Sequence, residues 1–483
     1  MRDFNYYVEN VGEIGFVSEI QHSLAYVTGL PSAKPFEVVF FESGEIGQIL
    51  SLEKKFVEVL LLSHSFVRVG TKVARSNETL TIGLGEGILG KVVNPLGNPF
   101  LGSSSYKVKE YRPLEKKPLG ITHRKNVDRP FETGVSLVDL LIPLGRGQRE
   151  LIIGDRKTGK TQLLFQIALN QTRAGMICIY AAIAKRRIEL KQYLDFFAKK
   201  GVLKNMVVVA SYSSDPAGLI YLTPYTAMTI AEYYKDQGKD VLLILDDMTT
   251  HAKFYREISL LAKRFPGRSS YPGDIFYIHA RLMERAGNFK KGSITCLAVA
   301  ETVMGEISGY IQTNLMSMTD GHIYFDTNLF NQGKRPAINH FLSVTRVGLQ
   351  TQTELVRDLS RQLGSFLAHT QKLKQFMHFG AELTESVKQT LALGERIETF
   401  FQQSYEETNP LDMTVLILAA LWSGHWRDVQ PEVIKREMRE MIEFYNSDSN
   451  YQNQVKNAIS KSRNLRELIS QVVTNPDLLR KKT

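Results

Sequence analysis

Hydrophobic positions change their spacing twice along the chain, and these changes mark three regions. In residues 1 to about 70, short apolar runs such as residues 36–41 and 57–62 recur between Gly and Pro residues. Short apolar runs separated by turn residues predict β-strands. Closely spaced strands in so short a stretch predict a small β-barrel or sandwich.

Between residues 71 and 355, apolar strands alternate with helical patterns. The predicted strands include residues 151–154, 176–181, 206–210, 241–245 and 293–298. This alternation is typical of an α/β domain with a mainly parallel sheet. Strand patterns end after residue 355, and helical patterns follow. The sequence therefore predicts three domains: a β-barrel at 1–70, an α/β domain at 71–355 and an α-helical domain at 356–483.

A phosphate-binding loop follows the strand that precedes residue 154. Four residues separate two glycines and Lys-Thr follows, over Gly154, Asp155, Arg156, Lys157, Thr158, Gly159, Lys160 and Thr161. The glycines let backbone N–H groups curl around a phosphate, and the start of the predicted helix at 162–169 adds positive potential. Lys160 can reach the β- and γ-phosphates, and Thr161 can bind Mg²⁺. ATP or ADP is the predicted ligand.

A second signal for a nucleotide site lies downstream of this loop. The apolar strand at 241–245 ends in Asp246 and Asp247. A carboxylate at such a strand end suits Mg²⁺, held directly or through water across from Thr161. Apolar strands that end in Asp are common. This strand indicates a nucleotide site only because the phosphate-binding loop at 154–161 precedes it in the chain.

Composition and charge argue against a disulfide-rich protein and against a nucleic-acid-binding protein. Apolar residues make up 43%, enough for ordinary cores, and the two cysteines lie in apolar runs, which favours buried thiols over a disulfide framework. The net charge is +10; residues 1–50 hold two basic and seven acidic residues, so the remainder carries +15. A basic surplus suits nucleic acid or an anionic membrane, but no run exceeds three basic residues. We therefore favour a dispersed charged surface with nucleotide ligands and no nucleic-acid partner.

Several segments resemble the α subunits of F-type ATP synthases. They are the phosphate loop, the Tyr-Pro-Gly-Asp segment at 271–286, the Ser-Val-Thr-Arg-Val-Gly segment at 343–348, and residues 319–324 and 87–97. The last of these is shared by several rotary and secretion ATPases and indicates only the superfamily. The resemblance covers residues 13 to about 445. It implies an N-terminal small β-barrel, a central RecA-like P-loop domain and a C-terminal helical bundle.

In that family, three α and three β subunits alternate in a ring around a rotating γ stalk, and α binds Mg²⁺ with ATP or ADP without hydrolysing it. The resemblance implies a non-catalytic, regulatory subunit of an enzyme that couples ATP synthesis to proton transport. It implies a peripheral place at the cytoplasmic face of a bacterial inner membrane, or at the matrix or stromal face if the gene is encoded in an organelle. The peripheral stalk with its δ subunit stays open as a partner, because residues 1–10 are too short for a stable isolated helix.

Lys185 departs from the family pattern. At the end of the strand at 177–184, catalytic relatives have Glu and α subunits have Gln. A lysine ammonium is a poor general base but can pair with a γ-phosphate, which favours binding without turnover. A solvent-facing Lys185 is the alternative. Lys157, where the family usually has Gln, would add a second cation near the phosphates or lie at the surface.

The resemblance assigns a catalytic role in the neighbouring subunit to Arg346. In the family this arginine reaches into the β site in trans, as an arginine finger that stabilises charge on the transferring phosphoryl group. An arginine that is ion-paired within its own domain is the alternative. Ser343 lies close by and is expected to fix the local turn.

Three further residues match family positions at the nucleotide. Glu301 matches an acid that orders water on Mg²⁺, and the alternative is an acid at a strand end without a ligand. Gln402 matches a glutamine on the adenine side, whereas a second family glutamine is replaced by Ser404. Arg335 matches another residue of the adenine pocket, with a simple turn residue as the alternative.

The sequence leaves two alternative functions open. A self-sufficient hexameric RecA-type ATPase, such as an export ATPase or an RNA helicase, would suit the basic charge, but the barrel region is acidic and Lys185 replaces the expected catalytic Glu. An α-like subunit of a divergent complex that does not synthesise ATP is the third possibility.

Overall fold

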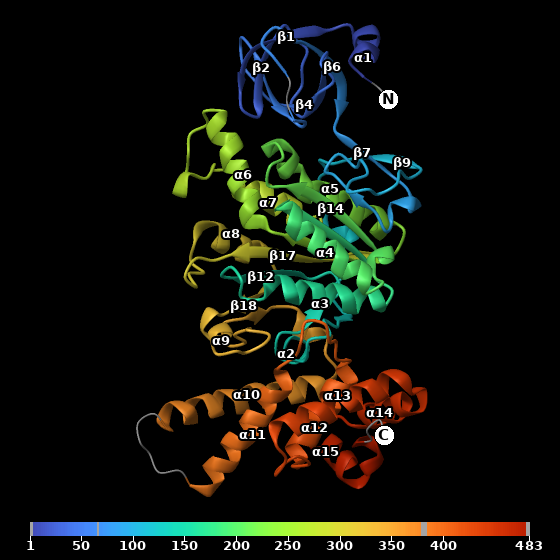
Figure 1. Cartoon of the computed structure of the whole chain (residues 1–483), viewed down its shortest axis with the longest axis vertical. Helices are drawn as coiled ribbons and strands as arrows, with labels where there is room; N and C mark the ends of the chain where they lie inside the picture. Colours follow the sequence, from blue (N-terminus) through green and yellow to red (C-terminus); the bar gives the residue numbers. More distant parts are fainter. Residues whose placement is uncertain (1–2, 65–66, 378–383, 480–483) are drawn as a thin grey trace. The chain divides into compact units, whose positions relative to one another are not determined.

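The computed structural model describes residues 3–64, 67–377 and 384–479. Figure 1 draws the chain with its helices and strands labelled. Residue contacts divide the chain into two compact units, each assembled from separate stretches of sequence. Unit 1 comprises Met1–Asn126, Arg149–Ile153 and Thr172–Thr319, and unit 2 comprises Val127–Gln148, Gly154–Gln171 and Asp320–Thr483. We describe each unit by itself.

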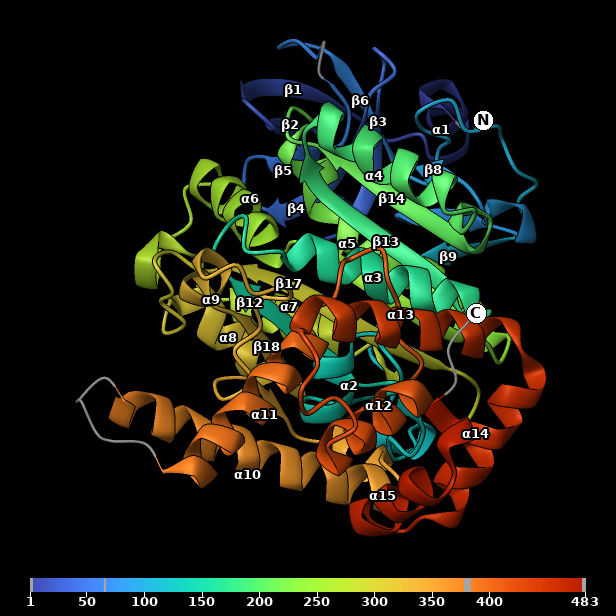
Figure 2. The same ribbon diagram turned by 60° about the horizontal axis from the view of Figure 1, so that its bottom comes forward.

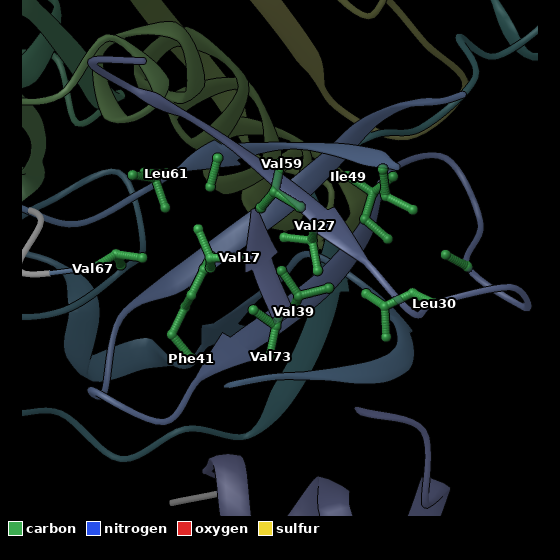
Figure 3. Close-up of a cluster of buried hydrophobic side chains, with 13 residues drawn as sticks. Val17, Val27, Leu30, Val39, Phe41, Ile49, Val59, Leu61, Val67 and Val73 are labelled. Carbon is green, nitrogen blue, oxygen red and sulfur yellow. The ribbon is translucent and has the colours of Figure 1, made fainter. Parts of the chain in front are cut away.

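Six strands of unit 1 form a closed barrel in the order β1-β2-β5-β4-β3-β6. They are β1 (Ile14–Gln21), β2 (Leu24–Thr28), β3 (Glu37–Phe41), β4 (Ile46–Leu52), β5 (Val57–Leu61) and β6 (Lys72–Thr79). Alternate residues of a strand face the same side, and Val57, Val59 and Leu61 of β5 accordingly contribute to the apolar core. Figure 3 shows this core, where side chains from different strands meet inside the barrel.

The barrel extends beyond the predicted boundary at residue 70. Strand β6 begins at Lys72 and pairs with both β1 and β3, so the barrel closes only with this strand. The strands predicted at residues 36–41 and 57–62 are confirmed as β3 and β5, whereas a strand predicted at residues 67–69 is wrong, because those residues form a loop and turn before β6. The boundary at residue 355 stays a prediction.

A short helix precedes the barrel, where the sequence predicts none. Helix α1 (Phe4–Val11) is capped by the Asp3 side chain, which accepts a hydrogen bond from the Tyr6 N–H. Tyr7 is buried, and its ring stacks on Phe40 of β3 with 4.7 Å between centroids. The segment is short for an isolated helix, and packing against the barrel supplies the missing stability.

The central sheet of unit 1 has the order β12-β17-β15-β13-β14-β8, with β16 paired to β17. Its strands are β8 (Val92–Val93), β12 (Arg149–Gly154), β13 (Ile177–Lys185), β14 (Met206–Tyr212), β15 (Asp240–Asp246), β16 (Gly287–Asn288) and β17 (Ser293–Glu301). The pairs β13–β14, β13–β15 and β15–β17 are parallel, as predicted. Parallel strands end at the same edge of a sheet. Lys185, Asp246 and Glu301 therefore end three neighbouring strands at one edge.

Helices and a two-stranded ribbon complete unit 1. The ribbon is β7 (Thr81–Leu84) with β9 (Glu110–Pro113), and the helices are α4 (Arg187–Lys199), α5 (Ala217–Asp236), α6 (Met248–Leu261), α7 (Ile275–Met283) and α8 (Tyr310–Met318). Helix α5 packs against β13, β14 and β15 and is buried along nearly its whole length. An apolar helix buried on all sides holds the centre of the sheet in place.

Unit 2 contains the phosphate loop and the C-terminal helices. Its elements are β10 (Pro130–Phe131), α2 (Ser136–Leu141), β11 (Leu144–Gly145), α3 (Lys160–Arg173), β18 (Gly321–Phe325), α9 (Thr327–Asn331), β19 (Val344–Thr345), α10 (Glu354–Met377), α11 (Glu385–Phe401), α12 (Leu411–Ser423), α13 (Pro431–Ser447), α14 (Ser449–Lys461) and α15 (Leu465–Thr474). Helix α12 carries the longest apolar run and contacts α11, α13, α14 and α15 (Figure 2). Within the described part of the chain, no helix is both long and apolar enough to cross a membrane.

The barrel core yields a stability prediction. Phe41 is fully buried in the core, so Phe41→Ala should lower the free energy of unfolding of the barrel by about 3–5 kcal/mol in a urea titration. The matched control is Phe16→Ala, because Phe16 lies in the same barrel and is 49% exposed. A loss of similar size in both variants would contradict the assigned core.

Candidate nucleotide-binding site

The backbone of the phosphate loop requires glycine at both glycine positions of the motif, Gly154 and Gly159. Gly154 has φ 157°, and a Cβ placed there would lie 2.6 Å from the backbone oxygen of Phe325. Gly159 has φ 105°, a conformation that residues with a side chain rarely adopt. The loop therefore packs closely against Phe325 and then turns sharply into α3, as the sequence predicts for a phosphate cradle.

Lys160 begins helix α3 and points back over the loop. Its Nζ donates to the backbone oxygens of Gly154 at 2.7 Å and Asp155 at 2.6 Å. The side chain is buried, so the ammonium is held against the backbone of the loop. The helix start adds its own positive potential at the same place.

Two of the other loop residues form hydrogen bonds that hold the loop, and two are exposed to solvent. The Thr158 hydroxyl donates to the Asp155 backbone oxygen at 2.8 Å, and the Asp155 carboxylate accepts from Thr327 at 2.9 Å. Arg156 and Lys157 are exposed, and Thr161 is half-buried in the first turn of α3. Lys157 has φ 62°, so its backbone forms the sharp turn of the loop.

A cavity of about 320 Å³ opens beside this loop, entirely within unit 2. One wall comes from the loop and α3, a second from Phe325 and residues 335–337, and a third from residues 403–405. Phe325, Leu163 and Tyr405 supply apolar and aromatic surface. Its volume and its mixture of apolar walls with a few polar groups are typical of a small-molecule site. A purine ring next to the phosphate loop suits it.

Arg335 lines this cavity, but Gln402 does not. The Arg335 guanidinium donates to the backbone oxygens of Phe330 and Lys334 and lies 3.7 Å from the centre of the Phe330 ring. Gln402 is exposed and accepts from Lys435 at 3.2 Å. The lining residue is the next glutamine, Gln403.

Gln403 is buried and anchors the cavity wall. Its Nε2 donates to the backbone oxygens of Gly134 at 2.6 Å and Glu407 at 2.9 Å, and its Oε1 accepts from Ser136 N–H at 3.2 Å. Sequence reasoning missed this residue, because two consecutive glutamines at the end of α11 give no signal for which one turns inward. Ser404, which replaces a second family glutamine, also lines the cavity.

In unit 1, Lys185 forms a buried ion pair with Asp246. Lys185 Nζ lies 2.8 Å from Asp246 Oδ1, and the two side chains are 13% and 4% exposed. Tyr180 donates to the other oxygen, Asp246 Oδ2, at 2.7 Å. Burial by itself lowers the pKa of Lys185, but attraction to Asp246 and Asp247 outweighs it and raises the pKa above its ordinary value. The alternative of a solvent-facing Lys185 is therefore wrong.

A bulge at the end of β13 directs Lys185 toward Asp246. The pairing of β13 with β14 shifts register between Ala182 and Lys185, and Ala184 adopts φ 51°. A bulge re-aims the side chains that follow it, and a non-glycine residue with positive φ is costly unless its surroundings hold it in place. The Ala184 N–H donates to Ser211 Oγ at 3.0 Å, which fixes the bulge.

The two predicted Mg²⁺ residues differ in how well they suit a metal. Thr161 is half-buried at the start of α3, where its hydroxyl can serve as a ligand. Both oxygens of Asp246 already accept from other groups, one of which is a cation. The neighbouring Asp247 caps α6 by accepting from Thr250 N–H at 2.6 Å, and the Glu301 N–H donates to Thr249 at 3.0 Å. Asp246 therefore fits Mg²⁺ poorly.

Arg346 and Ser343 lie on one anchored loop of unit 2. The Ser343 hydroxyl donates to the Asn339 backbone oxygen at 2.7 Å and accepts from Tyr324 N–H at 2.9 Å. The Arg346 N–H donates to the Asp320 oxygen at 2.9 Å, whereas its side chain is exposed. Within the described ranges, no carboxylate forms an ion pair with Arg346, so the alternative of an internally paired arginine has no support there.

Comparison with known proteins gives the family. Models of the ATP synthase alpha/beta family match twice: its nucleotide-binding domain at residues 134–345 and its C-terminal domain at residues 352–475. A protein named ATP synthase subunit alpha from Petrotoga mobilis is 39% identical over 95% of this chain and 92% of its own length. The chain belongs to the ATP synthase alpha/beta family.

Two further relatives of the same name agree with this assignment. The relative from Dictyoglomus turgidum is 42% identical over 84% of this chain and 81% of its own length. The relative from Staphylococcus epidermidis is 39% identical over 91% of this chain and 88% of its own length. Membership in the ATP synthase alpha/beta family confirms the resemblance to F-type α subunits. It also confirms the barrel, nucleotide-binding and helical regions in their predicted order.

The cavity wall predicts different effects on ATP binding for two adjacent residues, Gln403 and Gln402. Gln403→Ala removes three hydrogen bonds, two of them buried, and should weaken ATP binding to the full chain at least about fivefold, since the loss of a buried partner costs roughly 1–3 kcal/mol. Gln402→Ala, the matched control, should change the dissociation constant less than about twofold, because Gln402 is exposed. Titration with a fluorescent ATP analogue measures both. A larger effect at Gln402 would contradict this assignment.

Proposed function

We propose that this chain is the non-catalytic, ATP-binding α subunit of a rotary F-type ATP synthase. The phosphate loop, with Lys160 held over it and a purine-sized cavity beside it, carries the binding half of the proposal. ATP or ADP lies with its phosphates at Gly154–Thr161 and its base between Phe325, Arg335 and Gln403. Thr161 binds the accompanying Mg²⁺. The relatives' shared name supports the choice of ATP as ligand.

The lack of turnover rests on Lys185. Hydrolysis needs a group that accepts a proton from the attacking water or orients it. At the position where catalytic relatives have Glu, this chain has an ammonium paired with Asp246. A protonated lysine has no lone pair and cannot act as a base. The chain therefore binds nucleotide as a regulatory and structural subunit.

Arg346 acts on a neighbouring subunit in this proposal. Its side chain is exposed on a loop that Ser343 and Thr345 tie to the backbone, since Thr345 Oγ1 donates to the Pro143 oxygen at 2.9 Å. An arginine finger needs a free guanidinium on a rigid support. Arg346 supplies that charge to the catalytic site of β, and Ser343 keeps the loop in position.

The assembly follows from the same proposal. Three copies alternate with β subunits around γ, and the ring attaches to a membrane-embedded, proton-conducting sector. The chain is then peripheral, at the cytoplasmic face of a bacterial inner membrane or at the matrix or stromal face of an organelle. Helix α1 packs on β3 and β6 of the barrel, so the peripheral stalk with its δ subunit would meet a docked helix.

Replacement of Arg346 tests the proposal. Arg346→Ala should reduce ATP hydrolysis by the assembled ring about a thousandfold, while nucleotide binding to this chain stays unchanged, because the side chain serves the adjoining site. Arg361→Ala, an exposed arginine on α10, is the matched control and should leave activity unchanged. Near-normal hydrolysis by the Arg346→Ala ring would overturn the in-trans role.

A further inference from the structure

Gln166 of helix α3 is a buried glutamine that lines the cavity of unit 2. The residue is 2% exposed, and its Nε2 donates to the backbone oxygens of Ser404 at 3.3 Å and Glu407 at 2.6 Å. An amide NH₂ group can donate to two carbonyl oxygens, whereas an amide oxygen cannot. These two bonds therefore fix which end of the Gln166 amide faces the backbone of residues 404–407.

The other end of this amide, Oε1, is an acceptor that a ligand can use. Among the residues that the structure describes, none donates a hydrogen bond to Gln166 Oε1. An acceptor left without a partner in a buried place costs free energy, and a donor that enters the cavity would recover it. The fixed amide therefore favours a ligand that presents an N–H or O–H group at this point of the wall.

The place of Gln166 along α3 suits the base of a nucleotide better than its phosphates. Helix α3 begins at Lys160, and a rise of 1.5 Å per residue puts roughly 9 Å along the helix between Lys160 and Gln166. Leu163 lies one turn before Gln166 on the same face of the helix, and both line the cavity. A ribose fits between phosphates at the loop and a base beside these two side chains.

The other glutamines near the cavity do not offer such a group. Gln403 bonds to the backbone at both ends of its amide, since Nε2 donates to the Gly134 and Glu407 oxygens and Oε1 accepts from the Ser136 N–H. Gln402 is exposed and does not line the cavity. Gln403 thus shapes the wall, and Gln166 is left to contact the edge of a base.

We propose that Gln166 Oε1 accepts a hydrogen bond from the exocyclic amine at C6 of the purine, so that the site selects adenine over purines with a carbonyl at C6. This inference rests on the proposed function. Adenine has a donor at C6, whereas guanine and hypoxanthine have an acceptor there. Two facing acceptors share no proton, and Gln166 cannot turn its NH₂ group to the base without losing its bonds to Ser404 and Glu407. A fixed polar group left unpaired in this way rejects the wrong ligand.

The test compares the dissociation constants of ATP and inosine triphosphate, whose base has a carbonyl at C6, for the full chain. The natural chain should bind ATP at least about tenfold more tightly, as expected for one hydrogen bond that the wrong base leaves unmade. Gln166→Met has similar length and no such acceptor, so its two constants should agree within about threefold. Gln402→Ala is the matched control and should keep the natural ratio. A merely structural role of Gln166 would weaken both nucleotides alike and leave the ratio unchanged.

A third nucleotide gives a measurement that needs no variant. The triphosphate of purine riboside has only hydrogen at C6, so the natural chain should bind it at least about fivefold more weakly than ATP. Equal affinity for ATP and either analogue, or a natural ratio in Gln166→Met, would overturn the inference and leave the proposed function standing. Failure of the natural chain to bind any of the three nucleotides would instead refute the proposed function.

Discussion

The close packing of Gly154 against Phe325 is the constraint on which the candidate site depends. No side chain fits between Gly154 and the backbone of Phe325, so the loop stays close to β18 before it turns at Gly159 into α3. The same contact fixes Phe325 as a wall of the cavity, beside Arg335 and Gln403. The candidate phosphate loop and the cavity beside it thus both depend on one close backbone approach within unit 2.

The buried pair of Lys185 and Asp246 is the corresponding constraint in unit 1. Removing one partner of a buried ion pair leaves an uncompensated charge, which typically costs about 3–5 kcal/mol. The pair forms because a bulge in β13, with Ala184 in a left-handed conformation, directs Lys185 toward the next strand. In the proposed function the same pair has a second consequence, because it holds Lys185 as an ammonium, which cannot act as a general base.

Periodicity and local motifs predict much of this architecture. The strands at 176–181, 206–210, 241–245 and 293–298 and the loop at 154–161 follow from local residue patterns, and the structure contains each of them. Features that depend on tertiary packing were missed. Helix α1 forms because Tyr7 packs on Phe40, β6 is needed to close the barrel, and Gln403 turns inward while Gln402 faces solvent. The partner of Lys185 could not be read from sequence either, because a register shift decides where that side chain points.

Retention of intact ATP by the isolated full chain tests the central claim most directly. The chain would be loaded with ATP labelled at the γ-phosphate, freed of unbound nucleotide, and sampled for released phosphate over time. The account predicts that bound ATP stays uncleaved, because Lys185 offers no base. Brisk phosphate release by the chain alone would contradict it.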